Sequence, residues 1–152
     1  MVRSDVRAGS CPVAVRERRT LGTELARSSP CRWQNTSVAV IDGKATYDGR
    51  TLASWAPDVA QRIVERCGAS TVVLFGSVAT GDDGPDSDID LLVVIPVPGR
   101  RHDTAVRVLN ELRDLPVPID VTVVDPARLD VEATVPGVVR LAMREGRVVF
   151  AA

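Results

Sequence analysis

The sequence predicts a single α/β domain in which a small mixed sheet is covered by helices. Two short apolar runs, residues 71–75 and 88–95, are typical of buried strands, because they are rich in β-branched residues and are stopped by Gly76 and Pro96. A third run of this kind, residues 119–124, follows a segment with helical spacing. With 152 residues, of which 45% are hydrophobic and 26% charged, the chain has the size and composition of one globular domain.

The first part of the chain lacks this periodicity. Residues 1–48 mix polar, arginine, serine and glycine residues, so we expect a poorly ordered N-terminal extension over 1–48 and the folded domain over 49–152. Within the extension, Val38–Ile41 and Ala45–Tyr47 flank Asp42-Gly43, a pattern compatible with a short hairpin. Lys44 is the only lysine among the nineteen basic residues, which we attribute to codon composition rather than to function.

An amphipathic helix is predicted from Leu52 to Cys67. Its apolar residues recur at spacings of three and four, Thr51 or Ser54 can cap its start, and Gly68 ends it. We expect this helix to pack on the sheet, with Cys67 in the core and Trp55 either in the core or at the edge of a groove.

The remaining elements follow the second strand. Helical spacing recurs from Ala105 to Leu115, and a last helix is expected over Pro136–Glu145, with Val138, Leu141 and Ala142 facing inward. Gly146 ends that helix, and Arg147–Phe150 forms a short terminal strand. Arg100 and Arg101 either form a solvated face or reach a bound anion.

Composition excludes several classes of protein. No run approaches the roughly 20 apolar residues of a membrane span, and the N-terminus lacks an apolar signal region, so a cytoplasmic location is expected. Three cysteines and one histidine, His102, give neither a zinc site nor a disulfide framework. Residues 50–152 carry eleven bases against fifteen acids, which argues against nucleic acid as the main partner.

Acidic residues concentrate between the first two strands. Five aspartates fall within residues 82–90, and no lysine or arginine lies between Arg66 and Arg100. On a strand, Asp88 and Asp90 share a face, where two carboxylates repel each other unless they are protonated or bridged by a metal. Mg²⁺ is commonly held by one or two carboxylates together with substrate phosphates, which suits this pair.

Gly76-Ser77 precedes this pair by about ten residues. A strand that ends in Gly-Ser and turns into a short helical segment, closed here by Gly81, offers backbone N–H groups and a hydroxyl to a phosphate. A phosphate cradle followed by a metal-binding carboxylate pair is the arrangement that holds a nucleoside triphosphate by its phosphates and by its metal.

The aspartates have two other interpretations, an EF-hand and a set of turn residues. Residues 86–97 imitate the start of an EF-hand, but Leu91 stands where glycine is needed and Val97 where the closing glutamate is needed. Asp82, Asp83 and Asp86 are well explained as turn formers. Neither interpretation explains Asp88 and Asp90, which we place on the strand.

The pattern Gly76-Ser77 followed by Ser87-Asp88-Ile89-Asp90-Leu91 resembles the signature of the DNA polymerase β-type nucleotidyltransferase superfamily, and specifically its minimal nucleotidyltransferase (MNT) members. The resemblance covers about residues 50–152. It implies a polymerase β-like fold and the Mg²⁺-dependent transfer of a nucleotide, AMP from ATP, to a hydroxyl group.

The resemblance also assigns roles to residues. It implies that Asp88 and Asp90 hold two Mg²⁺ ions, that Asp120 supplies the third catalytic and metal-binding carboxylate, and that Gly76, Ser77 and Ser87 bind the nucleotide. From the residues alone, Asp120 is equally well explained as a solvated residue at the start of its strand. The chain departs from many family members, which carry bases where this chain has Val78 and Thr80, and the departure weakens the grip on phosphate.

MNT proteins of this size resemble antitoxins encoded beside a HEPN-domain ribonuclease toxin, in which AMP is attached to a tyrosine of the toxin. We therefore expect ATP as substrate and a HEPN-type toxin as partner, whose basic surface the acidic residues 50–152 would complement. About thirty residues follow Asp120 in this sequence, so we do not expect a second domain that grips a primer or a sugar. The alternatives are a small-molecule adenylyltransferase of the antibiotic-modifying kind and a non-catalytic binding protein that retains the fold.

Overall fold

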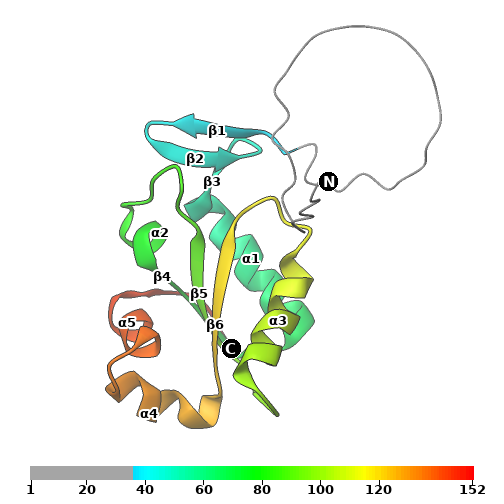
Figure 1. Cartoon of the computed structure of the whole chain (residues 1–152), viewed down its shortest axis with the longest axis vertical. Coiled ribbons are helices and arrows are strands. Elements are labelled where there is room, and N and C mark those ends of the chain that lie inside the picture. Colours follow the sequence, from blue (N-terminus) through cyan, green and yellow to red (C-terminus); the bar gives the residue numbers. More distant parts are fainter. Residues whose placement is uncertain (1–35) are drawn as a thin grey trace, which may run out of the picture.

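The computed structural model describes residues 36–152, which form a four-stranded sheet, a smaller three-stranded sheet and the helices that cover the larger one (Figure 1). The strands are β1 Val38–Ile41, β2 Lys44–Tyr47, β3 Arg50–Thr51, β4 Thr71–Phe75, β5 Ile89–Val94, β6 Ile119–Val124 and β7 Arg147–Ala151. The helices are α1 Leu52–Cys67, α2 Gly76–Thr80, α3 Arg101–Leu112, α4 Leu129–Thr134 and α5 Val138–Glu145, with a 3₁₀ turn at Pro126–Arg128.

The larger sheet is mixed, as predicted. Its strand order is β6-β5-β4-β7. Strand β4 pairs antiparallel with β5 and with β7, whereas β5 and β6 run parallel and are connected through α3. A parallel pair needs such a crossover connection, and the predicted bounds of β4 and β6 are confirmed residue for residue.

Each face of the sheet is covered by different helices. Val72 and Leu74 belong to the core that contains α1 and α3, whereas the alternate residues Val73 and Phe75 pack with α5. Figure 1 shows α1 and α3 on one side of the sheet and α5 on the other. Because both faces are covered, the central strands are apolar along almost their whole length.

Helix α1 confirms the predicted bounds and caps. Thr51 Oγ1 accepts a hydrogen bond from the Ser54 backbone N–H at 3.4 Å, and Gly68 ends the helix with φ of 74°. That left-handed conformation favours glycine, because it has no Cβ to clash with the backbone.

Helix α5 corrects the predicted inward face. Val138 and Leu141 are 47% and 44% exposed, whereas Val139 is 6% exposed and Ala142 fully buried. The helix begins only at Val138, after Gly137. In a helix of eight residues, the position of the sheet, rather than the sequence pattern, selects which side is buried. The 3₁₀ turn and α4 were not predicted.

The predicted hairpin is present, and it corrects the expected domain boundary. Strand β2 pairs with β1 and with β3, so a boundary at residue 49 would cut the three-stranded sheet. Ala45 and Thr46 are buried, and Trp55 Nε1 of α1 donates to the Tyr47 carbonyl at 3.0 Å. Residues 36–48 therefore belong to the folded part of the chain, and the rest of the predicted extension, residues 1–35, lies outside the described residues.

Among residues 36–152, no helix combines the length and apolar character needed to span a membrane. His102 is exposed in the first turn of α3, as expected, and Cys67 is half-buried. Cys11 and Cys31 lie outside the described residues.

Candidate functional site

Three strands bring the predicted site residues to one end of the larger sheet. In the parallel pair β5 and β6, Asp90 is the register partner of Asp120, and in the antiparallel pair β4 and β5, Asp90 is opposite Phe75. Neighbouring strands lie about 4.8 Å apart, so both aspartates and Gly76, the residue after Phe75, form one cluster. The predicted position of Asp88 on the strand is wrong: Asp88 lies just before β5, which begins at Ile89.

Gly76 is needed at this position for two reasons. Its φ is +69°, a conformation that L side chains rarely adopt, and a Cβ on it would lie 2.2 Å from Asp90 Oδ2. The missing side chain therefore makes room for the Asp90 carboxylate. The sequence predicted a glycine that lets an anion approach the backbone, and the nearest anion in the structure is the protein's own carboxylate.

The cluster is electrostatically unbalanced. Burial raises the pKa of Asp90 above its ordinary value, and the nearby carboxylates of Asp88 and Asp120 raise it further. Within residues 36–152, the Asp90 carboxylate takes part in no ion pair or hydrogen bond. Like charges that share a site without a counter-charge favour protonation or the binding of a cation.

The donor set of the cluster suits a hard cation, although the side chains do not form a complete cage. Carboxylate oxygens are the ligands that Mg²⁺ prefers. In the described part of the chain, no group of three or more His, Cys, Asp or Glu side chains is arranged to hold a metal ion by itself. The arrangement therefore fits an ion that is held by one or two carboxylates and completed by oxygens of another molecule, as is usual for Mg²⁺.

Ser77 and Ser87 meet beside this cluster. Ser77 Oγ donates to Ser87 Oγ at 3.1 Å, and the Gly84 backbone N–H donates to the same Ser87 oxygen at 2.9 Å. The structure thus brings together two of the three residues predicted to bind a nucleotide, and the third, Gly76, immediately precedes Ser77 in the sequence. Val78 stands at one of the two positions where many family members carry a base. Its side chain is buried in the core at 3% exposure, which explains why this chain has no base there.

Asp83 was predicted to be a simple turn former, which is wrong. Its side chain is only 1% exposed and pairs with Lys44 Nζ at 2.5 Å, while Asp83 Oδ2 is buried without a hydrogen-bond partner. Sequence reasoning missed this pair, because the two residues are 39 positions apart. The isolated lysine within a predicted hairpin was the one available signal.

Arg100 and Arg101 lie at the other end of the sheet from the carboxylates. They follow the C-terminal end of β5, and Arg101 pairs with Glu132 of α4. The suggestion that they reach an anion bound at the predicted site is therefore wrong.

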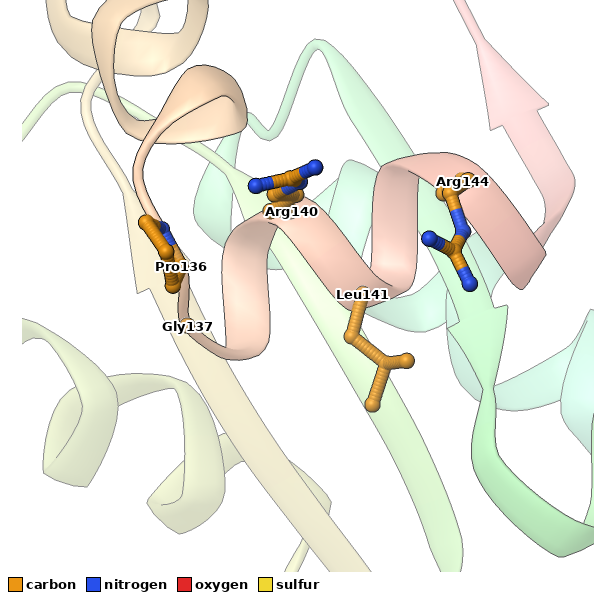
Figure 2. A pocket seen from close by; sticks show the side chains of 5 residues that line it. All are labelled: Pro136, Gly137, Arg140, Leu141 and Arg144. Atoms are coloured by element: carbon orange, nitrogen blue, oxygen red, sulfur yellow. The ribbon is translucent and has the colours of Figure 1, made fainter.

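A shallow pocket lies on α5, separate from the predicted site residues. Pro136, Gly137, Arg140, Leu141 and Arg144 line it, and Figure 2 shows the first two just before α5 and the other three along it. Exposed apolar side chains nearby are those of Val131 on α4, Val135 just after α4, and Val138 and Met143 on α5. This exposed apolar side of α4 and α5, with Arg140 and Arg144 beside it, is here called the α4–α5 face.

Comparison with known proteins gives one family match. Residues 57–149 match the family model described as "Nucleotidyltransferase domain". The hairpin β1–β2 lies outside the matched residues. No curated protein matches the chain. A crystal structure from Sulfolobus solfataricus, of a protein provisionally assigned as a nucleotidyltransferase, is similar at 20% identity with a TM-score of 0.46, covering 64% of this chain and 78% of that chain.

Proposed function

Because the chain belongs to the nucleotidyltransferase domain family, we propose that it transfers AMP from ATP to a hydroxyl group of a partner protein and releases pyrophosphate. Nucleotidyl transfer in general follows from the family. The identities of the nucleotide, of the metal and of the acceptor are what we propose.

One observation carries the proposal: Asp90 and Asp120 are register partners on parallel strands, beside Gly76 and without a basic partner among the described residues. Asp90 is partly buried, and a partly buried carboxylate that lacks a counter-charge is costly in a protein that has no use for it. A carboxylate with a raised pKa, such as Asp90, that lies beside other carboxylates at one end of a sheet is characteristic of a functional site.

In the proposed site, Asp88, Asp90 and Asp120 would hold two Mg²⁺ ions, which, when bound, neutralise the triphosphate and ease the loss of the acceptor proton. Gly76, Ser77 and Ser87 orient the triphosphate through backbone N–H groups and hydroxyls. Asp120 lies on the edge strand β6 and is exposed, so it faces the side that an acceptor can approach.

One bond forms and one breaks in the transfer step. The acceptor oxygen forms a bond to the α-phosphorus of ATP, and the bond from that phosphorus to the bridging oxygen of the β-phosphate breaks. Pyrophosphate leaves with the electron pair of that bond, and the hydroxyl proton passes to solvent. The residues of the chain position the reactants rather than form a covalent intermediate.

A partner protein is favoured as acceptor by the α4–α5 face. Exposed apolar side chains that gather on one side of a protein are a feature of sites where another protein binds. Val135, Val138, Leu141 and Met143 are each more than 40% exposed. We propose a helical, HEPN-type toxin as this partner. The second candidate, a small-molecule adenylyltransferase, would need no such face.

The experiment is co-purification from the native source, followed by incubation with ATP and Mg²⁺ and intact-mass measurement. We expect a retained partner that gains one or more AMP groups, and no gain when the Asp90→Asn variant replaces the wild type. AMP transfer to a free small molecule, with no partner retained, would favour the second candidate. No transfer to any acceptor would contradict both.

A further inference from the structure

The hairpin β1–β2 is fastened to the segment that connects Ser77 with Asp88. Lys44 of β2 donates both to the Gly81 carbonyl at 2.8 Å and to Asp83 Oδ1 at 2.5 Å. Gly81 ends α2, and Asp83 lies in the loop that follows. We call residues 81–88 the site loop. Figure 1 shows the hairpin lying beside this loop, at the end of the sheet where β5 begins.

The site loop determines where Ser87 lies. The Ser87 backbone N–H donates to the Gly84 carbonyl at 3.3 Å, and Ser87 Oγ accepts from the Gly84 N–H and from Ser77 Oγ. Asp88 comes immediately after this turn. A residue that fixes the position of the start of the loop therefore also fixes the contact between Ser77 and Ser87 and the position of the backbone that leads to Asp88.

Lys44 is the one basic group that pairs with Asp83 among the described residues. The Asp83 side chain is 1% exposed, and its second oxygen has no donor, so the charge depends on the single ion pair. A buried carboxylate that loses its only cationic partner is strongly unfavourable and moves toward water. Without Lys44, the site loop would have to rearrange so that Asp83 becomes hydrated.

Rearrangement of the loop has a consequence for ligand affinity. A ligand that binds only the ordered form of a loop shows an apparent affinity reduced by the fraction of molecules in which the loop is ordered. The same ligand at saturating concentration restores the ordered form. Loss of Lys44 should therefore weaken the binding of a nucleotide more than it slows the chemistry at saturation.

We propose that Lys44 is a positioning residue of the nucleotide site: through Gly81 and Asp83 it orders the site loop, and thereby Ser87 and Asp88, for the binding of a nucleoside triphosphate. The inference rests on the proposed function and deepens it. It assigns a role to the hairpin, which lies outside the residues that match the family model.

The test compares Lys44→Met and Lys44→Arg with Arg50→Met in the full chain. Arg50 is a matched control: its side chain is 38% exposed against 37% for Lys44, and it pairs with Asp58 of α1 and stacks on Trp55 without touching the site loop. The probes are a non-transferable ATP analogue with Mg²⁺, whose affinity is measured by calorimetry, and amide hydrogen exchange of the site loop without ligand.

We expect Lys44→Met to weaken binding of the analogue by about tenfold or more, as the loss of a charged hydrogen bond implies. Exchange at the Gly84 and Ser87 amides should become faster, and the KM for ATP should rise while kcat is largely retained. Lys44→Arg should keep most of the affinity, because a guanidinium can donate to both acceptors. Arg50→Met should bind the analogue within about twofold of the wild type.

Two results overturn the inference while the proposed function stands: wild type and Lys44→Met bind the analogue equally tightly, or Lys44→Met and Arg50→Met weaken binding to the same extent. If the wild type itself does not bind the analogue with Mg²⁺, the proposed function fails, and the role of Lys44 fails with it.

Discussion

Both ends of the larger sheet carry aspartates, but the surroundings at the two ends shift the aspartate pKa values in opposite directions. At one end, Asp125 follows β6 directly, and its carboxylate accepts hydrogen bonds from the Val97 and Ala127 backbone N–H groups at 2.8 and 2.9 Å. These bonds lower its pKa below the ordinary value. At the other end, burial raises the pKa of Asp90, and the neighbouring Asp88 and Asp120 raise it further.

We propose that this difference distinguishes a structural carboxylate, Asp125, from a functional one, Asp90. Asp125 closes a turn at the start of a 3₁₀ segment, and its charge is stabilised by groups that the fold already supplies. Asp90 gains nothing of that kind from the described residues. A fold keeps such a carboxylate where a ligand from solution completes the site.

The largest effect is expected from replacing Asp90. In Asp90→Asn, the rate of AMP transfer should fall by about 10³-fold. The reason is that the Asp90 charge, through the bound metal, is expected to stabilise the transition state by several kcal/mol. Removal of one like charge relieves repulsion, so the melting temperature without metal should stay level or rise. Transfer assays and thermal denaturation measure both. A clear drop in melting temperature would make Asp90 a structural residue like Asp125.

The next effect concerns the contact between Gly76 and Asp90. Gly76→Ala should lose about 1–2 kcal/mol of stability from the left-handed backbone alone. It should also displace the Asp90 carboxylate, whose Oδ2 would lie 2.2 Å from the new Cβ, and so reduce transfer.

Gly68→Ala is the matched control for this change. Gly68 has a φ of +74°, and nothing lies within 4 Å of a Cβ placed there, so only the backbone penalty applies. Urea denaturation of both variants, beside transfer assays, separates the two contributions. If Gly68→Ala reduced transfer as much as Gly76→Ala, the close approach of Gly76 to Asp90 would have no functional importance.

A smaller effect is expected at Asp125. Asp125→Asn should lower the melting temperature at neutral pH, because the charged acceptor of two backbone N–H groups is replaced by a neutral one. Transfer should be unchanged, since the residue lies at the far end of the sheet. A loss of transfer with unchanged stability would reverse the assignment of the two ends.

The pH dependence of stability sharpens the same contrast. The lowered pKa of Asp125 contributes stability that is present above the ordinary carboxyl value of 3.8 and is lost as pH falls through the lowered value. The raised pKa of Asp90 acts in the opposite direction: metal-free protein loses stability as pH rises from 3.8 through the raised value. Denaturation of the wild type, Asp90→Asn and Asp125→Asn across this range should therefore show each variant losing one of the two slopes.

Local patterns predicted much of this fold, because β-branched runs, helical spacing and caps act over a few residues. The bounds of β4, β6 and α1 illustrate this. The short helix α5 shows the limit of local patterns. Whether Val138 or Val139 faces inward depends on where the sheet lies, and the sequence of an eight-residue helix does not specify that position.

The candidate site divides in the same way. Gly76, Ser77, Asp88 and Asp90 could be found within one stretch, but the pairing of Asp90 with Asp120 depends on the register of two parallel strands. The ion pair between Lys44 and Asp83 joins segments 39 residues apart, and no local pattern predicts it. Contacts of this kind depend on how distant elements pack, which the sequence does not reveal by inspection.

The central claim is that the Asp90 carboxylate is held ready for a metal and a nucleotide rather than satisfied by the fold. The most direct test is an NMR titration of the aspartate carboxyl carbons, with and without Mg²⁺ and a non-transferable ATP analogue. We predict that, without metal, the pKa of Asp90 lies above the ordinary value of 3.8 and that of Asp125 below it. Addition of Mg²⁺ and the analogue should lower the pKa of Asp90 and leave that of Asp125 unchanged. A pKa of Asp90 below the ordinary value without metal, or one that Mg²⁺ and the analogue leave unchanged, would contradict the claim.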